Sequence, residues 1–165
     1  MSKSTICFIG KRPKDLVIDY GDNALGLIEE YIEDFVKSNP NVQLATSLSY
    51  GIEYIAGKIF QKHQLPYHVF LTFNNQEKIW PKKTQEEYKQ LLLNAKSVNQ
   101  VETGEWSLDR LKLKDKTLIE QSNTVYYLLD KKPYGNFTNK ELIKINLNKE
   151  EKSESDENLE EGFSF

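Results

Sequence analysis

Residues 44–59, LATSLSYGIEYIAGKI, join an apolar stub to a helix-like pattern through small polar residues. A helix that begins near Ser49 or Tyr50 has free backbone N–H groups in its first turn, and such groups favour an anion such as phosphate. Gly51 allows a ligand to approach the backbone closely, while Ser47 and Ser49 supply hydroxyl donors. The alternative interpretation is that Ser49 is a plain N-cap and that Gly51 serves helix–strand packing.

Glu53 lies in the first turn of the same predicted helix, where a carboxylate stabilises the helix dipole. That structural role would be enough to explain its position. The functional alternative is that the carboxylate accepts hydrogen bonds from ribose hydroxyls beside a bound phosphate. It would also be placed to act as a general acid or base in the cleavage of an N-glycosidic bond.

A second loop follows the first predicted strand and combines a tight turn with two cations, in the order Gly10, Lys11, Arg12 and Pro13. Arg12 can fork onto a phosphate group. The structural alternative is that both cations are simply solvated.

A third loop carries Gln76 and Trp80. An aromatic ring at Trp80 either stacks on a base or caps a hydrophobic corner. We expect structural roles for His63 and His68, which are isolated in the sequence. The single cysteine, Cys7, lies in the apolar run TICFI and is expected to be a small buried hydrophobe.

These three loops lie together only if the strands before them are parallel neighbours. Apolar, β-rich runs alternate with amphipathic helical patterns, which predicts a parallel sheet layered by helices. Ligands of such sheets bind outside the carboxyl ends of the strands. The expected strands are 5–9, 42–46, 67–73, 123–130 and a short one within 97–102. The expected helices are 22–37, one from 51 onward, 84–96, 107–121 and a weaker one at 138–149.

The composition is that of an ordinary globular chain of 165 residues, with 38% hydrophobic and 28% charged residues. No apolar run reaches the roughly 20 residues of a membrane span, and the N-terminus does not resemble a secretion signal. One cysteine excludes an internal disulfide, so a cytoplasmic location is expected. No Cys/His cluster indicates a metal, and we expect no cofactor beyond a nucleotide-type ligand.

The net charge of −3 is distributed unevenly along the chain. Residues 150–165, EEKSESDENLEEGFSF, carry a net charge of −6, which leaves the remaining body at +3. A mildly basic body suits a small anionic ligand but not a nucleic acid. We therefore expect a domain over residues 1–149 and a disordered acidic tail over 150–165. The tail either binds a basic partner protein or only keeps the chain soluble.

The order of four segments resembles the YpsA-like branch of the SLOG superfamily, which groups Smf/DprA-type and LOG-type proteins. The segments are FIGKRP, TSLSYGIEYIAGKI, FNNQEKIWPKKTQEEYKQLLLNAKSV and TLIEQSNTVYYLLD. The resemblance covers roughly residues 5–140. It implies a Rossmann-like three-layer α/β sandwich, with a mostly parallel sheet of about five strands, and a site for a nucleotide or nucleotide-derived ligand.

Carried over by position, the resemblance implies a site that contains Gly10, Arg12, Pro13, Ser47, Gly51, Glu53, Gln76 and Trp80. Leu48 replaces the first glycine of the family's S-G-x-x-G-x-E element, and Tyr50 precedes Gly51. Asp115 and Asn123 replace an Asn and an Asp on the approach to the last core strand. The P-G-G-x-G-T-x-x-E loop of LOG-type phosphoribohydrolases is missing. These departures bear on catalysis more than on binding.

Three functions therefore follow from the sequence. The first is a regulatory or sensory module that binds a nucleotide-derived ligand over the Gly10 and Gly51 loops. The second is a hydrolase of the N-glycosidic bond of nucleoside monophosphates, with Glu53 as its catalytic carboxylate. The third is a ligand-free interaction scaffold. The apolar helix faces would also permit a homo-oligomer.

Overall fold

Strand β1 (Ser4–Gly10) lies in the interior of a six-stranded sheet because its run Ile6–Ile9 is apolar and buried on both faces. The computed structural model describes residues 3–133 and 135–147, so the predicted acidic tail at 150–165 lies outside the described residues. The strand order is β4-β3-β2-β1-β5-β6, and every paired neighbour is parallel. The remaining strands are β2 (Val42–Thr46), β3 (Tyr67–Leu71), β4 (Ser97–Gln100), β5 (Thr124–Leu128) and β6 (Glu141–Lys144).

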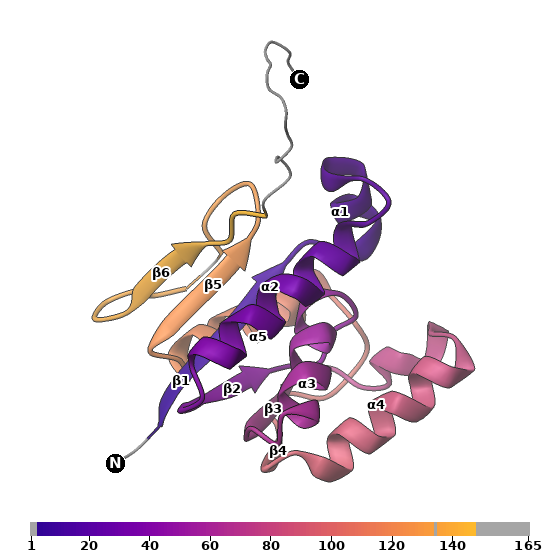
Figure 1. Ribbon diagram of the computed structural model, residues 1–165. Helices are drawn as coiled ribbons and strands as arrows, with labels where there is room; N and C mark the ends of the chain where they lie inside the picture. Colours follow the sequence, from indigo (N-terminus) through magenta and orange to yellow (C-terminus); the bar gives the residue numbers. More distant parts are fainter. Residues whose placement is uncertain (1–2, 134, 148–165) are drawn as a thin grey trace.

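Helices cover the two faces of the sheet, which gives three layers (Figure 1). On one face, Phe8 and Leu44 pack with Ile28 and Ile32 of one helix and Phe60 of another. On the other face, Cys7 and Ile9 pack with Leu118 and Ile119. The helices are α1 (Pro13–Tyr20), α2 (Ala24–Ser38), α3 (Ile52–Lys62), α4 (Lys82–Asn94), α5 (Leu108–Glu120) and the short 3₁₀ turn η1 (Gln76–Ile79).

The parallel α/β architecture confirms the predicted fold class, with six strands in place of about five. Cys7 is fully buried, and burial raises the pKa of its thiol to about 12, as suits a core hydrophobe. None of the helices among the described residues combines the length and the apolar content that a bilayer crossing demands.

Segments near the two ends of the domain differ from the sequence predictions. Residues 13–20 form a helix that was not predicted, in place of the loop expected after Gly10. Pro13 occupies a first-turn position, where its missing N–H is not needed. The weak helix predicted at 138–149 is wrong. Glu141–Lys144 instead pairs with Thr124–Tyr127 as an edge strand, and Asn139, with φ 62°, turns the chain just before it. Ladder hydrogen bonds with β5 therefore override a weak helical pattern.

Leu48 follows the end of β2 and packs into the core against α3. Its side chain is fully buried although its backbone adopts φ 58°, a left-handed conformation that is uncommon for leucine. A Cβ atom added at Gly57 of α3 would collide with Leu48 Cδ2. The glycine therefore makes room for the leucine.

We predict that Gly57→Ala destabilises the fold by about 1–3 kcal/mol, because Leu48 is held by its backbone and cannot move aside. Urea denaturation measures the change. Gly26→Ala in α2 is the matched control, since the three heavy atoms nearest to the added methyl group all belong to the side chain of Asn23, which is exposed and makes no capping hydrogen bond. The control should be neutral or stabilising by up to about 1 kcal/mol. Equal stabilities of the two variants would contradict this packing argument.

Candidate functional site

The loops after β1 and β2 touch each other at the carboxyl edge of the sheet. A Cβ atom at Gly10 would lie 2.8 Å from Ile52 Cγ2, and one at Gly51 would lie 3.4 Å from Pro13 Cδ and 3.5 Å from the Lys11 carbonyl oxygen. Gly51 has φ 119°, which favours glycine. Both glycines thus permit close packing of the two loops, as in the structural alternative given above for Gly51.

The backbone amides that follow β2 donate within their own loop. The N–H of Leu48 donates to Thr46 Oγ1 at 3.0 Å, and the N–H of Ser49 donates to Ser47 Oγ at 3.2 Å. Gly51 is the N-cap of α3, which begins at Ile52, so the expected helix start at Ser49 or Tyr50 is wrong. The expectation that these amides face outward is therefore not met at Leu48 and Ser49.

Glu53 is the best-connected of the predicted site residues. Its side chain is 4% exposed, and the two carboxylate oxygens have different partners. Oε1 accepts a hydrogen bond from Ser47 Oγ and a longer one from the Ser47 N–H at 3.4 Å. Oε2 accepts from Lys114 Nζ at 2.6 Å. The carboxylate therefore joins α3 on one face of the sheet to α5 on the other.

Lys114 is a site residue that sequence reasoning missed. Its side chain is 5% exposed, and its ammonium group also lies 2.6 Å from Asp115 Oδ1. Burial alone would lower the pKa of Lys114, but the charges of Glu53 and Asp115 outweigh burial and raise the pKa above its ordinary value. The sequence did contain a signal, because Lys114 falls between Leu111 and Leu118 on the apolar stripe of its helix.

The third loop is tied to the second through Gln76. Its Nε2 donates to the Ser47 carbonyl oxygen at 2.9 Å and to Tyr88 Oη at 3.1 Å. Ser49 Oγ lies 2.6 Å from Ser47 Oγ and 3.5 Å from Gln76 Oε1. The structure thus brings Ser47, Ser49, Glu53 and Gln76 into one hydrogen-bonded network.

Trp80 packs into an aromatic cluster beside this network. Its ring centroid lies 5.3 Å from that of Tyr50, 5.8 Å from Tyr54 and 5.2 Å from Tyr88. Trp80 is 9% exposed, whereas Tyr50 is 44% exposed. The tryptophan therefore caps a hydrophobic corner, and Tyr50 presents an aromatic ring to solvent.

The two cations of the first loop have different surroundings. Lys11 Nζ lies 2.6 Å from an oxygen of Asp19 and 2.8 Å from one of Asp130. Both carboxylates raise the pKa of Lys11, and the effect of Asp130 is the larger. The side chain of Arg12 is 73% exposed and reaches only its helix neighbour Asp15, at 3.1 Å, among the contacts of the described residues. Arg12 is thus the cation of this loop that is available to an incoming anion.

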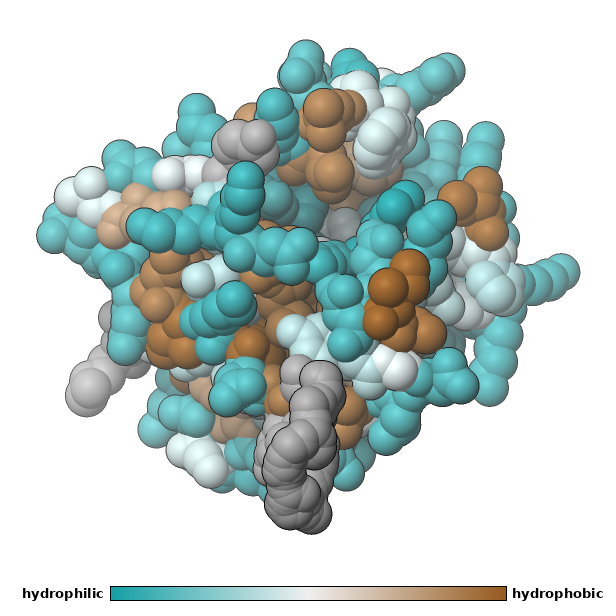
Figure 2. Space-filling view, turned by 90° about the horizontal axis from the view of Figure 1, so that it is seen from above, coloured by the Kyte–Doolittle hydropathy of each residue, from teal (hydrophilic) through white to brown (hydrophobic). Residues whose placement is uncertain are grey.

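The surface above these loops mixes chemical types. Figure 2 views the molecule from the end at which α1 lies in Figure 1, and it shows apolar patches separated by hydrophilic residues.

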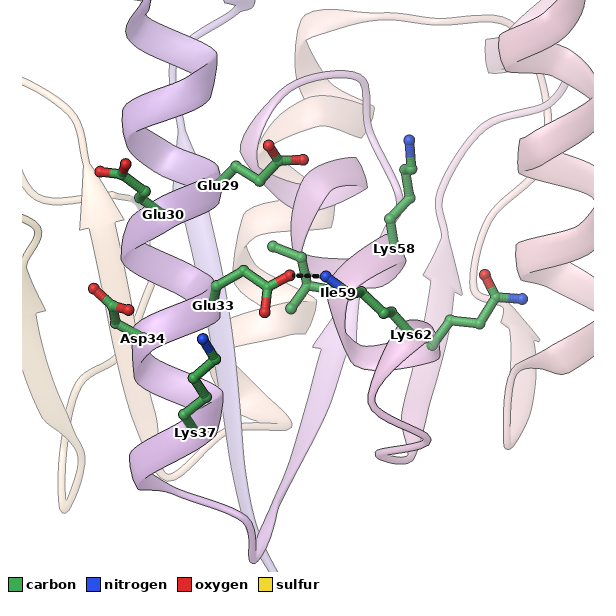
Figure 3. Close-up of a pocket in the computed structure, with 9 residues that line it drawn as sticks. Glu29, Glu30, Glu33, Asp34, Lys37, Lys58, Ile59 and Lys62 are labelled. Atoms are coloured by element: carbon green, nitrogen blue, oxygen red, sulfur yellow. Dashed lines mark hydrogen bonds and ion pairs between the residues drawn. The ribbon is translucent and has the colours of Figure 1, made fainter.

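A separate groove of about 720 Å³ lies between α2 and α3 and carries charges of both signs (Figure 3). Its Glu33 pairs with Lys62 at 2.6 Å, and the neighbouring His63 also contacts Glu33 at 2.6 Å. Lys62 and His63 lower the pKa of Glu33. This groove contains none of the predicted site residues. Among the described residues, no group of three His, Cys, Asp or Glu side chains is arranged to hold a metal.

Comparisons with known proteins bear on the family and the fold. The sequence model of the YpsA family, described as the YspA SLOG family, matches residues 6–159. The search of curated proteins finds no match. The X-ray structure of DNA processing protein A (DprA) from Streptococcus pneumoniae superposes with a TM-score of 0.50 at 11% identity, over 76% of this chain and 41% of that one.

A second solved structure is that of the molybdenum cofactor carrier protein MCP from Chlamydomonas reinhardtii. It gives a TM-score of 0.46 at 13% identity, over 76% of this chain and 61% of the carrier protein. This chain therefore spans less than two thirds of either solved protein. The fold and the site define a Rossmann-like α/β domain with a polar network at the carboxyl edge of its sheet. The chain belongs to the YpsA family of SLOG proteins.

We predict that Lys114→Met destabilises the protein by about 3–5 kcal/mol, because it leaves two acidic side chains without their buried counter-charge. The free energy of unfolding of the double variant Glu53→Gln/Lys114→Met should fall by less than the sum of the decreases in the two single variants, as measured by urea denaturation. Lys116→Met on the exposed side of α5 is the control, with an expected change within about 0.5 kcal/mol. A Lys114→Met variant as stable as this control would refute the role of the ion pair.

The raised pKa of Lys114 also predicts a pH dependence. The pKa of a lysine in the unfolded chain is about 10.4. The stabilisation by Lys114 is therefore fully present below that pH, and it is lost as the pH rises through the higher pKa of the folded state. The stability difference between the wild type and Lys114→Met should stay constant from pH 7 to about 10 and shrink above it. Denaturation at several pH values measures this difference, and a gap that widened above pH 10 would contradict the assignment.

Proposed function

We propose that the domain binds a nucleotide or a nucleotide-derived small ligand at the carboxyl edge of its sheet and acts as a regulatory or sensory module. The observation that carries this proposal is the buried network in which Lys114, Glu53 and Ser47 hold the loop after β2 in one conformation. A loop that is fixed before binding loses less conformational freedom when a ligand arrives.

The phosphate of the ligand is assigned to Arg12. Its guanidinium is exposed, and the adjacent Lys11 and Pro13 lie against Gly51 at the start of α3. A phosphate there would meet both a forked donor and the positive end of the helix dipole. The pairing with Asp15 on the surface is weak enough to be exchanged for a phosphate.

The sugar and the base are assigned to the next two loops. Ser49 and Gln76 are half-buried and present hydroxyl and amide groups beside the Glu53 network. The exposed ring of Tyr50, supported from behind by Trp80, offers a stacking surface for a base. This assignment gives Trp80 a supporting role beneath Tyr50.

The contacts of Glu53 favour binding over N-glycosidic hydrolysis. Both oxygens already accept hydrogen bonds from groups of the chain, so Glu53 would act by positioning Ser47 rather than by transferring a proton. Hydrolysis and a ligand-free scaffold remain as distinct outcomes of the experiment that follows.

We predict that the purified protein is stabilised by one or more compounds in a panel of nucleoside monophosphates, NAD and cyclic nucleotides. A ligand at 100 times its Kd should add about 2.7 kcal/mol, which a thermal shift detects. Arg12→Ala should keep the melting temperature of the free protein but weaken binding by about tenfold or more, because it removes a charge-assisted contact to the phosphate.

Lys89→Ala on the exposed face of α4 is the matched control, and its affinity should equal that of the wild type. Chromatography of the same mixtures for free base tests hydrolysis, with Glu53→Gln as the inactive comparison. If the wild type releases free base and Glu53→Gln does not, the binding proposal fails in favour of the hydrolase. If no compound shifts the melting temperature, the proposal fails in favour of the ligand-free scaffold.

A further inference from the structure

A second cluster of polar side chains lies at the other end of the sheet, where the strands begin. The register of the sheet places these side chains near one another. Thr5 of β1 pairs with Gln43 of β2, and His68 of β3 pairs with Ser97 of β4. These side chains line a hollow of about 420 Å³, together with Ala45, Phe70, Asn99 and Gln121. None of them belongs to the site at the carboxyl edge.

The hydrogen bonds in this cluster favour one tautomer of His68. Gln43 Nε2 donates to Thr5 Oγ1 at 2.9 Å, which turns Gln43 Oε1 toward His68 Nε2 at 3.0 Å. An amide oxygen only accepts, so His68 carries its proton on Nε2. His68 Nδ1 is then an acceptor, and Ser97 Oγ donates to it at 2.7 Å.

This arrangement is that of a nucleophile, a base and a group that orients the base. Ser97 Oγ also accepts a hydrogen bond from Asn99 Nδ2 at 3.1 Å, which favours negative charge on that oxygen. Burial, and secondarily Lys96, lowers the pKa of His68, which favours the neutral imidazole. Ser97 and His68 are both partly exposed to the hollow.

From this geometry we propose that Ser97, His68 and Gln43 form an acyl-transfer site for esters of short apolar acyl groups. Ala45 and Phe70 supply the apolar part of the hollow for the acyl chain. Ser97 Oγ forms a bond to the ester carbonyl carbon while its proton moves to His68 Nδ1. The bond from that carbon to the alcohol oxygen breaks, and the alcohol leaves with the proton from His68.

Water completes the cycle. With His68 Nδ1 as the base, water attacks the acyl-serine, the carboxylic acid leaves, and the proton returns to Ser97. Gln43 is a positioning residue in this scheme, because it touches the imidazole and not the ester. A neutral amide orients the ring but stabilises the imidazolium less than a carboxylate does, so a slow reaction is expected.

The test uses the full chain with p-nitrophenyl acetate and with a fluorophosphonate probe. The wild type should release p-nitrophenol faster than Ser97→Ala, and intact-mass and peptide spectra should place the phosphonyl adduct on Ser97. His68→Gln should lower the rate by about 100-fold or more, since the general base is lost. Ser38→Ala, at the end of α2, is the control and should react as the wild type does.

Gln43→Glu separates a catalytic cluster from a merely structural one. A carboxylate in place of the amide should raise the rate by tenfold or more and shift the pH profile upward, because it stabilises the imidazolium. The proposal is overturned if the wild type shows no adduct, if labelling persists in a folded Ser97→Ala, or if Gln43→Glu leaves both rate and pH profile unchanged. These outcomes do not depend on ligand binding at the carboxyl edge.

Discussion

The ion pair between Glu53 and Lys114 is the interaction on which the candidate site depends. It joins helices on opposite faces of the sheet across 61 residues of sequence. Both side chains are almost fully buried, so neither charge is tolerable without the other. The pair therefore restricts α3 and α5 to the one arrangement in which Glu53 also reaches Ser47. The conformation of the loop after β2 follows from this constraint.

This constraint explains how the network tolerates the unusual residues of the loop. Leu48 turns its side chain into the core at φ 58° and fills space left by Gly57. The amides of Leu48 and Ser49 then find acceptors in Thr46 and Ser47. The bulky Leu48 is thus accommodated below the loop, while Arg12 and Tyr50 remain exposed.

The two ends of the sheet offer different chemistry because parallel strands place like ends together. At the carboxyl edge, the loops that follow the strands gather charged and aromatic groups. At the opposite end, a row of side chains on neighbouring strands is fixed by the register of the ladder, as with His68 beside Ser97. The first arrangement suits recognition of a ligand, and the second suits a fixed proton path.

The sequence by itself determined the alternation of strands and helices, the parallel sheet, and the three loops that meet at its carboxyl edge. These features follow from local hydrophobic periodicity, which a single sequence contains. The sixth strand and the left-handed Leu48 depended on contacts that local patterns do not record. The buried position of Lys114 also depended on tertiary structure, because a lysine on an apolar stripe is stable only if a carboxylate pairs with it. That carboxylate comes from a helix distant in sequence. Tertiary structure also brought His68 to Ser97, because strand register is set by the whole sheet and not by either strand alone.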